Sequence, residues 1–276
     1  DYPSYLLKTL KELAVWTDTP KIVLLTPGIF NSAYFEHSYL AQEMGIQLVQ
    51  GHDLVCIDDY AYLKTTSGLK RVDVIYRRID DDFVDPEVGN PHSVIGVKGL
   101  IRAWKNKNVA IVNAPGCGIA DDKAVYSFVP EMINFYLKED PILPNIKTFM
   151  LSNKQDREYV FQNLKKMVTK PVAESGGYGI SIGKNLNSKE INKLKKDLMK
   201  DPKNYVAQPL IDLSTSPTFR KDSLFPRHLD LRPFILSGKK TYVTVGGLTR
   251  VALKRGSTVV NSSQGGGSKD TWVVDA

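Results

Sequence analysis

Cysteine is scarce in this 276-residue chain, and long apolar runs are absent. The two cysteines, Cys56 and Cys117, cannot build a disulfide framework, which is typical of a protein kept in a reducing compartment. The longest apolar runs, such as 22–25 and 109–112, fall far short of the roughly 18–20 residues that a membrane helix needs. The first residues also lack the charged and then apolar pattern of a secretory leader. We therefore expect a soluble, cytoplasmic, globular protein without a membrane partner.

Clustered histidines and a concentrated basic groove are lacking as well. The four histidines are scattered, whereas a zinc site needs about four clustered ligands, so we expect no zinc centre. The formal net charge is +7, but residues 184–205 carry seven lysines against three acids and account for four of these charges. Apolar residues recur there at helical spacing and no aromatic residue interleaves the lysines, which indicates the solvated face of an amphipathic helix. We expect no nucleic-acid partner.

Short apolar runs alternate with helical patterns over the first 115 or so residues. Strands are predicted at 21–26, 46–49, 54–57, 72–77 and 109–112, and helices at 33–44 and 97–105. Strands that alternate with helices favour a parallel α/β sheet. We expect a Rossmann-like α/β domain over residues 1–118.

The second half has a different pattern, which indicates an α+β domain over residues 119–276 with two subdomains that divide near 210–228. Helices are predicted at 123–137, at 157–167 and over the lysine-rich stretch. Strands are predicted at 148–151, 168–173, 205–210, 229–236, 241–245 and 258–260. Ser237-Gly238 lies between two of these strands and predicts a hairpin.

A glycine-rich loop follows directly after a strand that carries Lys170. Gly176, Gly177 and Gly179 have no Cβ, so the backbone can approach an anion and direct its N–H groups at phosphate oxygens. The ammonium of Lys170 would then reach the same phosphate. The alternative is a hairpin turn with an exposed lysine. We favour phosphate binding because further polar clusters follow in the same half.

These clusters lie on strands or next to a second glycine loop at 261–269. Asp230 and Arg232 share one face of a strand, and Arg250 follows Gly246-Gly247. A surface ion pair is the alternative for an Asp-x-Arg pattern.

Three residues of the first half are candidates for contact with a substrate. His37 lies on the helix that follows the Thr26-Pro27-Gly28 turn, where a Rossmann-like sheet offers a ligand site, although a solvent-facing histidine is the alternative. Arg77 and Arg78 are adjacent on a strand, so at most one of them meets a substrate. Cys117 lies between two glycines without a recognisable base, and we interpret it as a small filler residue.

The chain resembles the circularly permuted ATP-grasp proteins of type 2. This family is related to the ATP-dependent carboxylate–amine ligases, which include glutathione and glutathionylspermidine synthetases. The resemblance rests on motifs along nearly the whole chain: 25–28 (LTPG), 31–38 (NSAYFEHS), 74–82 (VIYRRIDDD), 113–116 (NAPG), 120–126 (ADDKAVY), 170–171 (KP), 175–179 (SGGYG), 227–234 (RHLDLRPF) and 261–272 (NSSQGGGSKDTW).

This resemblance implies a Rossmann-like pre-ATP-grasp domain followed by a circularly permuted ATP-grasp domain. By the resemblance, Lys123 and Lys170 match the two lysines that bind the ATP phosphates. The loop that covers the phosphates matches Ser175, Gly176, Gly177, Tyr178 and Gly179. The hinge that reads adenine through backbone groups matches Gln208, Pro209 and Leu210. Arg232 and Arg250 would neutralise charge on the transferred phosphoryl group.

The resemblance also implies an activity with Mg²⁺ as the second cofactor: an acid is activated by ATP as an acyl phosphate, and an amine displaces the phosphate. The family's Glu-x-Asn motif before Pro-Ser-Gly is absent from these residues, which leaves Asp230 and Asn261 as the candidate metal ligands. We therefore expect that a segment of the parent protein precedes Asp1, and that this incomplete chain alone is inactive. The alternative is a catalytically inactive nucleotide-binding or scaffold protein.

Overall fold

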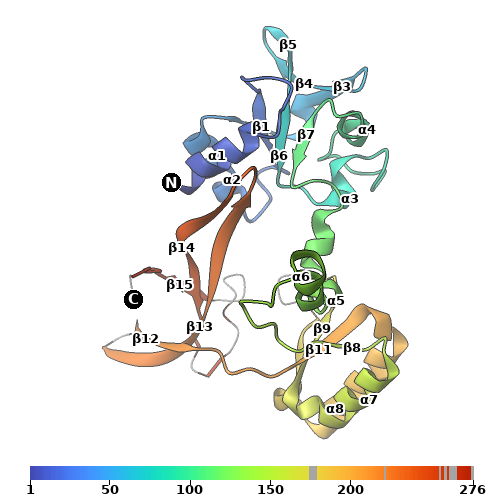
Figure 1. Ribbon diagram of the computed structural model, residues 1–276, viewed down its shortest axis with the longest axis vertical. Helices are drawn as coiled ribbons and strands as arrows, with labels where there is room; N and C mark the ends of the chain where they lie inside the picture. Colours follow the sequence, from blue (N-terminus) through green and yellow to red (C-terminus); the bar gives the residue numbers. More distant parts are fainter. Residues whose placement is uncertain (174–178, 221, 255, 258–259, 261–265, 275–276) are drawn as a thin grey trace. The chain divides into compact units, whose positions relative to one another are not determined.

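The computed structural model (Figure 1) describes residues 1–173, 179–220, 222–254, 256–257, 260 and 266–274. The chain forms two compact units. The first unit contains residues 1–118 and 233–245, and the second contains 119–232 and 246–276. The α/β fold class is confirmed, whereas the predicted domains at 1–118 and 119–276 stay a prediction.

The first unit is built on a four-stranded parallel sheet with the order β2-β1-β6-β7. These strands are β1 Ile22–Leu25, β2 Gln47–Val49, β6 Val74–Arg77 and β7 Ala110–Val112. All four residues of β1 are buried, as expected for a parallel strand that is covered on both faces.

Alternate residues of the sheet belong to two different cores. Val23, Leu25 and Ile75 pack into one core, which also contains residues of α4. Leu24 and Val74 pack into the other, which contains residues of α1 and α2. This two-residue period follows from the alternating side-chain direction of a strand. The helices of this unit are α1 Tyr2–Lys11, α2 Tyr34–Met44, α3 Asp81–Val84, α4 Leu100–Lys105 and the 3-10 helix Gly51–Asp53.

The tip of a long hairpin, residues 233–245, packs on α1 within the first unit. Leu236 joins the core of α1 and α2. The ring of Tyr242 stacks on Tyr5 with a centroid separation of 3.6 Å. The backbone N–H of Lys239 donates to a carboxylate oxygen of Glu12 at 3.1 Å. The hairpin turn predicted at Ser237-Gly238 lies here and is confirmed, because one strand ends at Ser237 and the next begins at Thr241.

The strand predicted at 54–57 belongs to a separate antiparallel sheet and not to the parallel one. This sheet has the order β3-β4-β5 and contains β3 Leu54–Ile57, β4 Tyr60–Thr65 and β5 Gly68–Arg71. Asp58 and Asp59 both have positive φ, and together they make the tight turn between β3 and β4. A two-residue turn of this kind pairs strands antiparallel, which explains the difference.

The second unit contains a four-stranded antiparallel sheet, and α7 and α8 lie beside it (Figure 1). Residues of both helices share a hydrophobic core with residues of this sheet. Its strand order is β10-β9-β11-β8. The second unit also contains α5 Lys123–Tyr126, α6 Val129–Leu137, β8 Phe149–Met150, α7 Lys154–Asn163, β9 Met167–Pro171, β10 Ser181–Ile182, α8 Ser188–Lys200, β11 Tyr205–Pro209 and 3-10 helices at Leu164–Lys166, Gly183–Asn185 and Pro202–Asn204. A further 3-10 helix, Cys117–Asp121, begins in the first unit and ends in the second. Asn187 and Glu190 form a capping box at the start of α8.

A further sheet has the order β12-β13-β14-β15. Its strands are β12 Thr215–Arg220, β13 Ser223–Ser237, β14 Thr241–Val251 and β15 Gly267–Lys269. The strands predicted at 229–236 and 241–245 are parts of β13 and β14. The strand predicted at 258–260 lies mostly outside the described residues. Among the helices that the structure describes, none combines the length and apolarity that crossing a bilayer requires.

Candidate functional site

The alternation of β9 determines which way Lys170 points. Met167, Thr169 and Pro171 are buried, and Met167 packs in the core of α7 and α8. Lys170 alternates with these residues and therefore lies on the opposite face of the sheet. Its Nζ donates to Oε1 of Gln208 at 2.7 Å.

Gln208 holds Lys170 from the neighbouring strand β11. Gln208 is 8% exposed, and its Nε2 donates to Oγ1 of Thr148 at 2.9 Å. The backbone of β11 pairs with β9, and the N–H of Leu210 donates to the carbonyl of Lys166 at 2.8 Å. Gln208 was expected to act through its backbone, and the structure adds a side-chain contact to Lys170.

Lys123 lies over the end of β9. It is the first residue of α5, whose N-cap Asp122 accepts from two backbone N–H groups. Both the backbone N–H and the Nζ of Lys123 donate to the carbonyl of Val172, at 3.2 and 3.3 Å. The structure thus brings Lys123 and Lys170 together, although they are 47 residues apart in the sequence.

The electrostatics of this pair favour an anion. Burial lowers the pKa of the Lys170 ammonium, and the positive charge of Lys123 lowers it further. A bound anion would relieve both effects, since an opposite charge nearby stabilises the protonated amine. The two lysines and Gln208 are therefore suited to hold a negatively charged group.

Gly179 is the one residue of the predicted phosphate loop within the described part of the chain. Its φ is +68°, and a Cβ at this position would lie 2.6 Å from Cγ of Pro171. Both the backbone conformation and the close approach therefore require glycine. The predicted loop residues Ser175, Gly176, Gly177 and Tyr178 lie outside the described residues.

Asp230 and Arg250 form a bidentate ion pair between β13 and β14. Nε of Arg250 donates to Oδ1 of Asp230 at 2.9 Å, and Nη2 donates to Oδ2. The hydrogen bonds to Asp230 raise the pKa of the Arg250 guanidinium. The polar partner of Asp230 is thus Arg250, whereas the side chain of Arg232 is exposed.

The two candidate Mg²⁺ ligands, Asp230 and Asn261, stay a prediction. Within this part of the chain, no three His, Cys, Asp or Glu side chains are grouped so that they could hold a metal ion. Both carboxylate oxygens of Asp230 accept from Arg250, and the other candidate ligand, Asn261, lies outside the described residues.

The predicted substrate residues lie in the first unit, Arg77 and Arg78 at the end of β6 and His37 on α2, but they differ in availability. Arg77 is buried. Its guanidinium donates to the carbonyls of Asn113 and Ile79, each at 2.7 Å, and lies 2.6 Å from Asp81. Arg77 therefore stabilises the 113–117 turn, and its guanidinium N–H groups donate to acceptors within the chain.

Arg78 is the more accessible of the two arginines. It contacts Oε1 of Glu36 at 2.5 Å, and Glu36 is more than half exposed. His37 is 2% exposed, its Nδ1 lies 2.9 Å from Oγ1 of Thr26, and burial lowers its pKa. The alternative of a solvent-facing His37 is thus wrong, because α2 turns this side chain into the unit.

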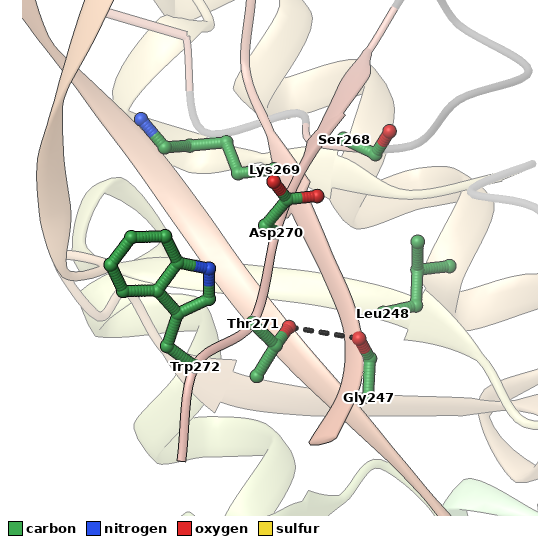
Figure 2. Close-up of a pocket in the computed structure, with 7 residues that line it drawn as sticks. All are labelled: Gly247, Leu248, Ser268, Lys269, Asp270, Thr271 and Trp272. Carbon is green, nitrogen blue, oxygen red and sulfur yellow. Dashed lines mark hydrogen bonds between the residues drawn. The ribbon is translucent and has the colours of Figure 1, made fainter. Parts of the chain in front are cut away.

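Two features were missed by the sequence analysis. One is Arg227 of β13, whose burial no sequence pattern indicates. The other is an open pocket of about 710 Å³ between β14 and the residues from β15 onward (Figure 2). It is lined by Gly247, Leu248, Ser268, Lys269, Asp270, Thr271 and Trp272. The hydroxyl of Thr271 donates to the carbonyl of Gly247 at 2.8 Å and ties the two segments together. The signal for this pocket in the sequence is the motif at 261–272, because its last five residues, 268–272, line the pocket.

Comparisons with known proteins identify relatives of this chain. An uncharacterised protein of Synechocystis sp. is 54% identical over 275 residues, which cover 99% of this chain and 57% of that protein. A Frankia alni protein named as a candidate glutamate–cysteine ligase is 42% identical over 257 residues, which cover 93% of this chain and 30% of that protein. The chain thus spans about half, or less, of the length of these curated relatives.

A solved structure shares the fold. The apo structure of a glutathione synthetase-like effector from Globodera pallida aligns with a TM-score of 0.58 at 11% identity, and the alignment covers 99% of this chain and 61% of the effector. The family model described as circularly permuted ATP-grasp type 2 matches residues 1–252. The chain therefore belongs to the circularly permuted ATP-grasp family, type 2.

Proposed function

We propose that this chain is the ATP-binding part of an ATP-dependent carboxylate–amine ligase that forms ADP. The observation that supports this most is the proximity of Lys123 and Lys170 at the end of β9. Burial and the charge of Lys123 both destabilise the protonated Lys170, and a bound anion would stabilise it. Lys170 and Lys123 would hold the phosphates. Gln208, Pro209 and Leu210 would lie beside the adenine.

The proposed reaction activates the carboxylate of an acid as an acyl phosphate, from which an amine displaces phosphate. The chain's own part is to position the groups and compensate charge, because phosphoryl transfer demands little else of a protein. Arg250, oriented by Asp230, and the exposed Arg232 are the candidates for contact with the transferred group. The name of the Frankia relative supports small acid and amine substrates.

On the substrate side we propose Arg78 and the buried His37 of the first unit. Arg78 would offer a guanidinium to a carboxylate, and His37 would position the turn after β1 through Thr26. Arg77 is a weaker candidate because it bonds to the backbone of the 113–117 turn. We derive no step through Mg²⁺, because among the described residues no three His, Cys, Asp or Glu side chains are grouped so that they could hold a metal ion.

Calorimetric titration with a non-hydrolysable ATP analogue tests the nucleotide site. Lys170→Met should weaken binding about 10- to 100-fold, because it removes a charged hydrogen-bond donor worth about 1.5–3 kcal/mol. The matched control is Lys196→Met, which removes an exposed lysine of α8 in the same unit. Equal affinities in the two variants would refute the assignment.

The second candidate function is nucleotide binding without turnover. The observation that favours it is that no cluster of three or more His, Cys, Asp or Glu side chains suited to a metal ion occurs among the described residues. Measuring ADP release with mixtures of amino acids as acids and amines separates the two. A protein that binds the nucleotide tightly and never releases ADP under these conditions would fit the second function.

A further inference from the structure

Arg227 is a buried arginine whose Nη1 has no hydrogen-bond partner among the described residues. It lies on β13 opposite Ser216 of β12, and it is 6% exposed. Its Nη1 is fully buried, and within the part of the chain that the structure describes this atom has no hydrogen-bond partner. The one specific contact of its guanidinium there is the ring of Phe225, whose centroid is 5.5 Å from Cζ.

This isolation is energetically unfavourable for an arginine. The guanidinium carries five N–H donors and cannot lose its charge in a protein. Burying a charge that is neither paired nor hydrogen-bonded is strongly unfavourable. A contact with an aromatic ring is a weaker interaction and does not offset that cost.

Among the described residues, two other arginines with poorly exposed side chains, at 7% and 12%, are satisfied. Arg77 reaches backbone carbonyls and Asp81, and Arg250 holds Asp230 through two hydrogen bonds. Each of these two guanidinium groups is therefore paired with acceptors of the chain itself. Arg227 is the exception among these three.

We propose that Arg227 binds an oxyanion of a ligand, either a carboxylate or a phosphate group. Such groups present two oxygens to the guanidinium fork, and they supply the negative charge that the site lacks. A neutral ligand would leave the buried charge uncompensated. Under the proposed function, on which this assignment of a source rests, the oxyanion belongs to the acid substrate or to ATP.

Thermal unfolding with simple anions as probes tests this proposal without a known substrate. The midpoint is measured in a chloride buffer and then with inorganic phosphate or acetate at equal ionic strength. We expect phosphate, acetate or both to raise the wild-type midpoint. Arg227→Met should unfold at a higher temperature than the wild type in chloride, because an unpaired buried charge is removed, and it should not respond to the anions.

Two further variants complete the test. Lys196→Met removes a positive charge from the surface of the same unit and should keep the full anion response. Arg227→Lys keeps the charge and loses the fork, so it should keep only part of the response; it also serves if Arg227→Met does not fold. The proposal is overturned if Arg227→Met responds to the anions like the wild type, or if no anion stabilises the wild type more than the variant.

Titration with the ATP analogue then identifies the source of the oxyanion. A loss of affinity of about 10-fold or more in Arg227→Met, with a phosphate response in the wild type, assigns the phosphates. Unchanged affinity together with a lost acetate response assigns the acid. The proposed nucleotide site fails separately, through unchanged affinity in Lys170→Met.

Discussion

Asp230 and Arg250 provide a quantitative test of how the second unit is held together. The ion pair is largely shielded from water, because the side chain of Arg250 is 12% exposed and that of Asp230 is 28% exposed. Removing one partner of a buried pair costs about 3–5 kcal/mol, because the other charge stays buried without compensation. Since Asp230 is partly exposed, we expect Asp230→Ala to lower the free energy of unfolding by about 2–3 kcal/mol.

This loss corresponds to a shift of about 4–12 °C in the unfolding midpoint for a unit of this size. Differential scanning calorimetry measures it directly. The matched control is Asp212→Ala, an exposed carboxylate of the same unit, which should stay within about 0.5 kcal/mol of the wild type. The double variant Asp230→Ala/Arg250→Met should recover much of the loss, with a coupling energy of about 1–3 kcal/mol.

Additive effects in this double-mutant cycle would refute the reasoning, as would a single variant indistinguishable from Asp212→Ala. The same set of proteins examines the metal assignment. Because Arg250 occupies both oxygens of Asp230, magnesium chloride should raise the midpoints of the wild type and Asp230→Ala equally. Stabilisation of the wild type alone would make Asp230 a metal ligand.

Three further predictions follow from individual residues. The pKa of Lys170 is lowered in the folded chain, so ATP binding at a pH between that pKa and about 10.5 should take up a proton. Calorimetry in buffers of different ionisation enthalpy measures this uptake, and equal binding heats in all buffers would contradict it. The pKa of His37 is lowered from 6.5, so the free energy of unfolding should fall as the pH drops below about 6.5. His37→Gln should flatten this pH dependence, whereas His92→Gln, at an exposed position, should not. An equal pH dependence in the wild type and both variants would contradict the prediction. Gly183→Ala places a Cβ 1.7 Å from the carbonyl oxygen of Leu164 and should destabilise by about 3 kcal/mol or more on urea unfolding, unlike Gly118→Ala, whose Cβ has room; a mild effect at Gly183 would be inconsistent with the structure.

The parallel sheet of the first unit was predictable because its strands are short, uninterrupted apolar runs. Ile22–Leu25 and Val74–Arg77 are recognisable without any tertiary information. The helix predicted at 123–137 is instead two helices, which break at Ser127 and Phe128 before Pro130. The contact of residues 233–245 with α1 could not be predicted from the sequence, because it joins segments more than 200 residues apart.

Part of the candidate site was also predictable. A lysine on a strand before a glycine loop indicated Lys170, and the resemblance supplied Lys123. That the two meet, and that Gln208 holds one of them, depends on strand pairing which no local pattern encodes. Arg227 was missed for the same reason, since the burial of an arginine depends on what the fold places around it.

Labelling with a lysine-reactive acyl phosphate of ATP, followed by peptide mass spectrometry, tests the central claim most directly. Such a reagent acylates the lysines that lie beside the bound phosphates. The account predicts that Lys123 and Lys170 are labelled, and that excess ATP protects both. Labelling confined to exposed lysines such as Lys196, with no protection by ATP, would contradict it.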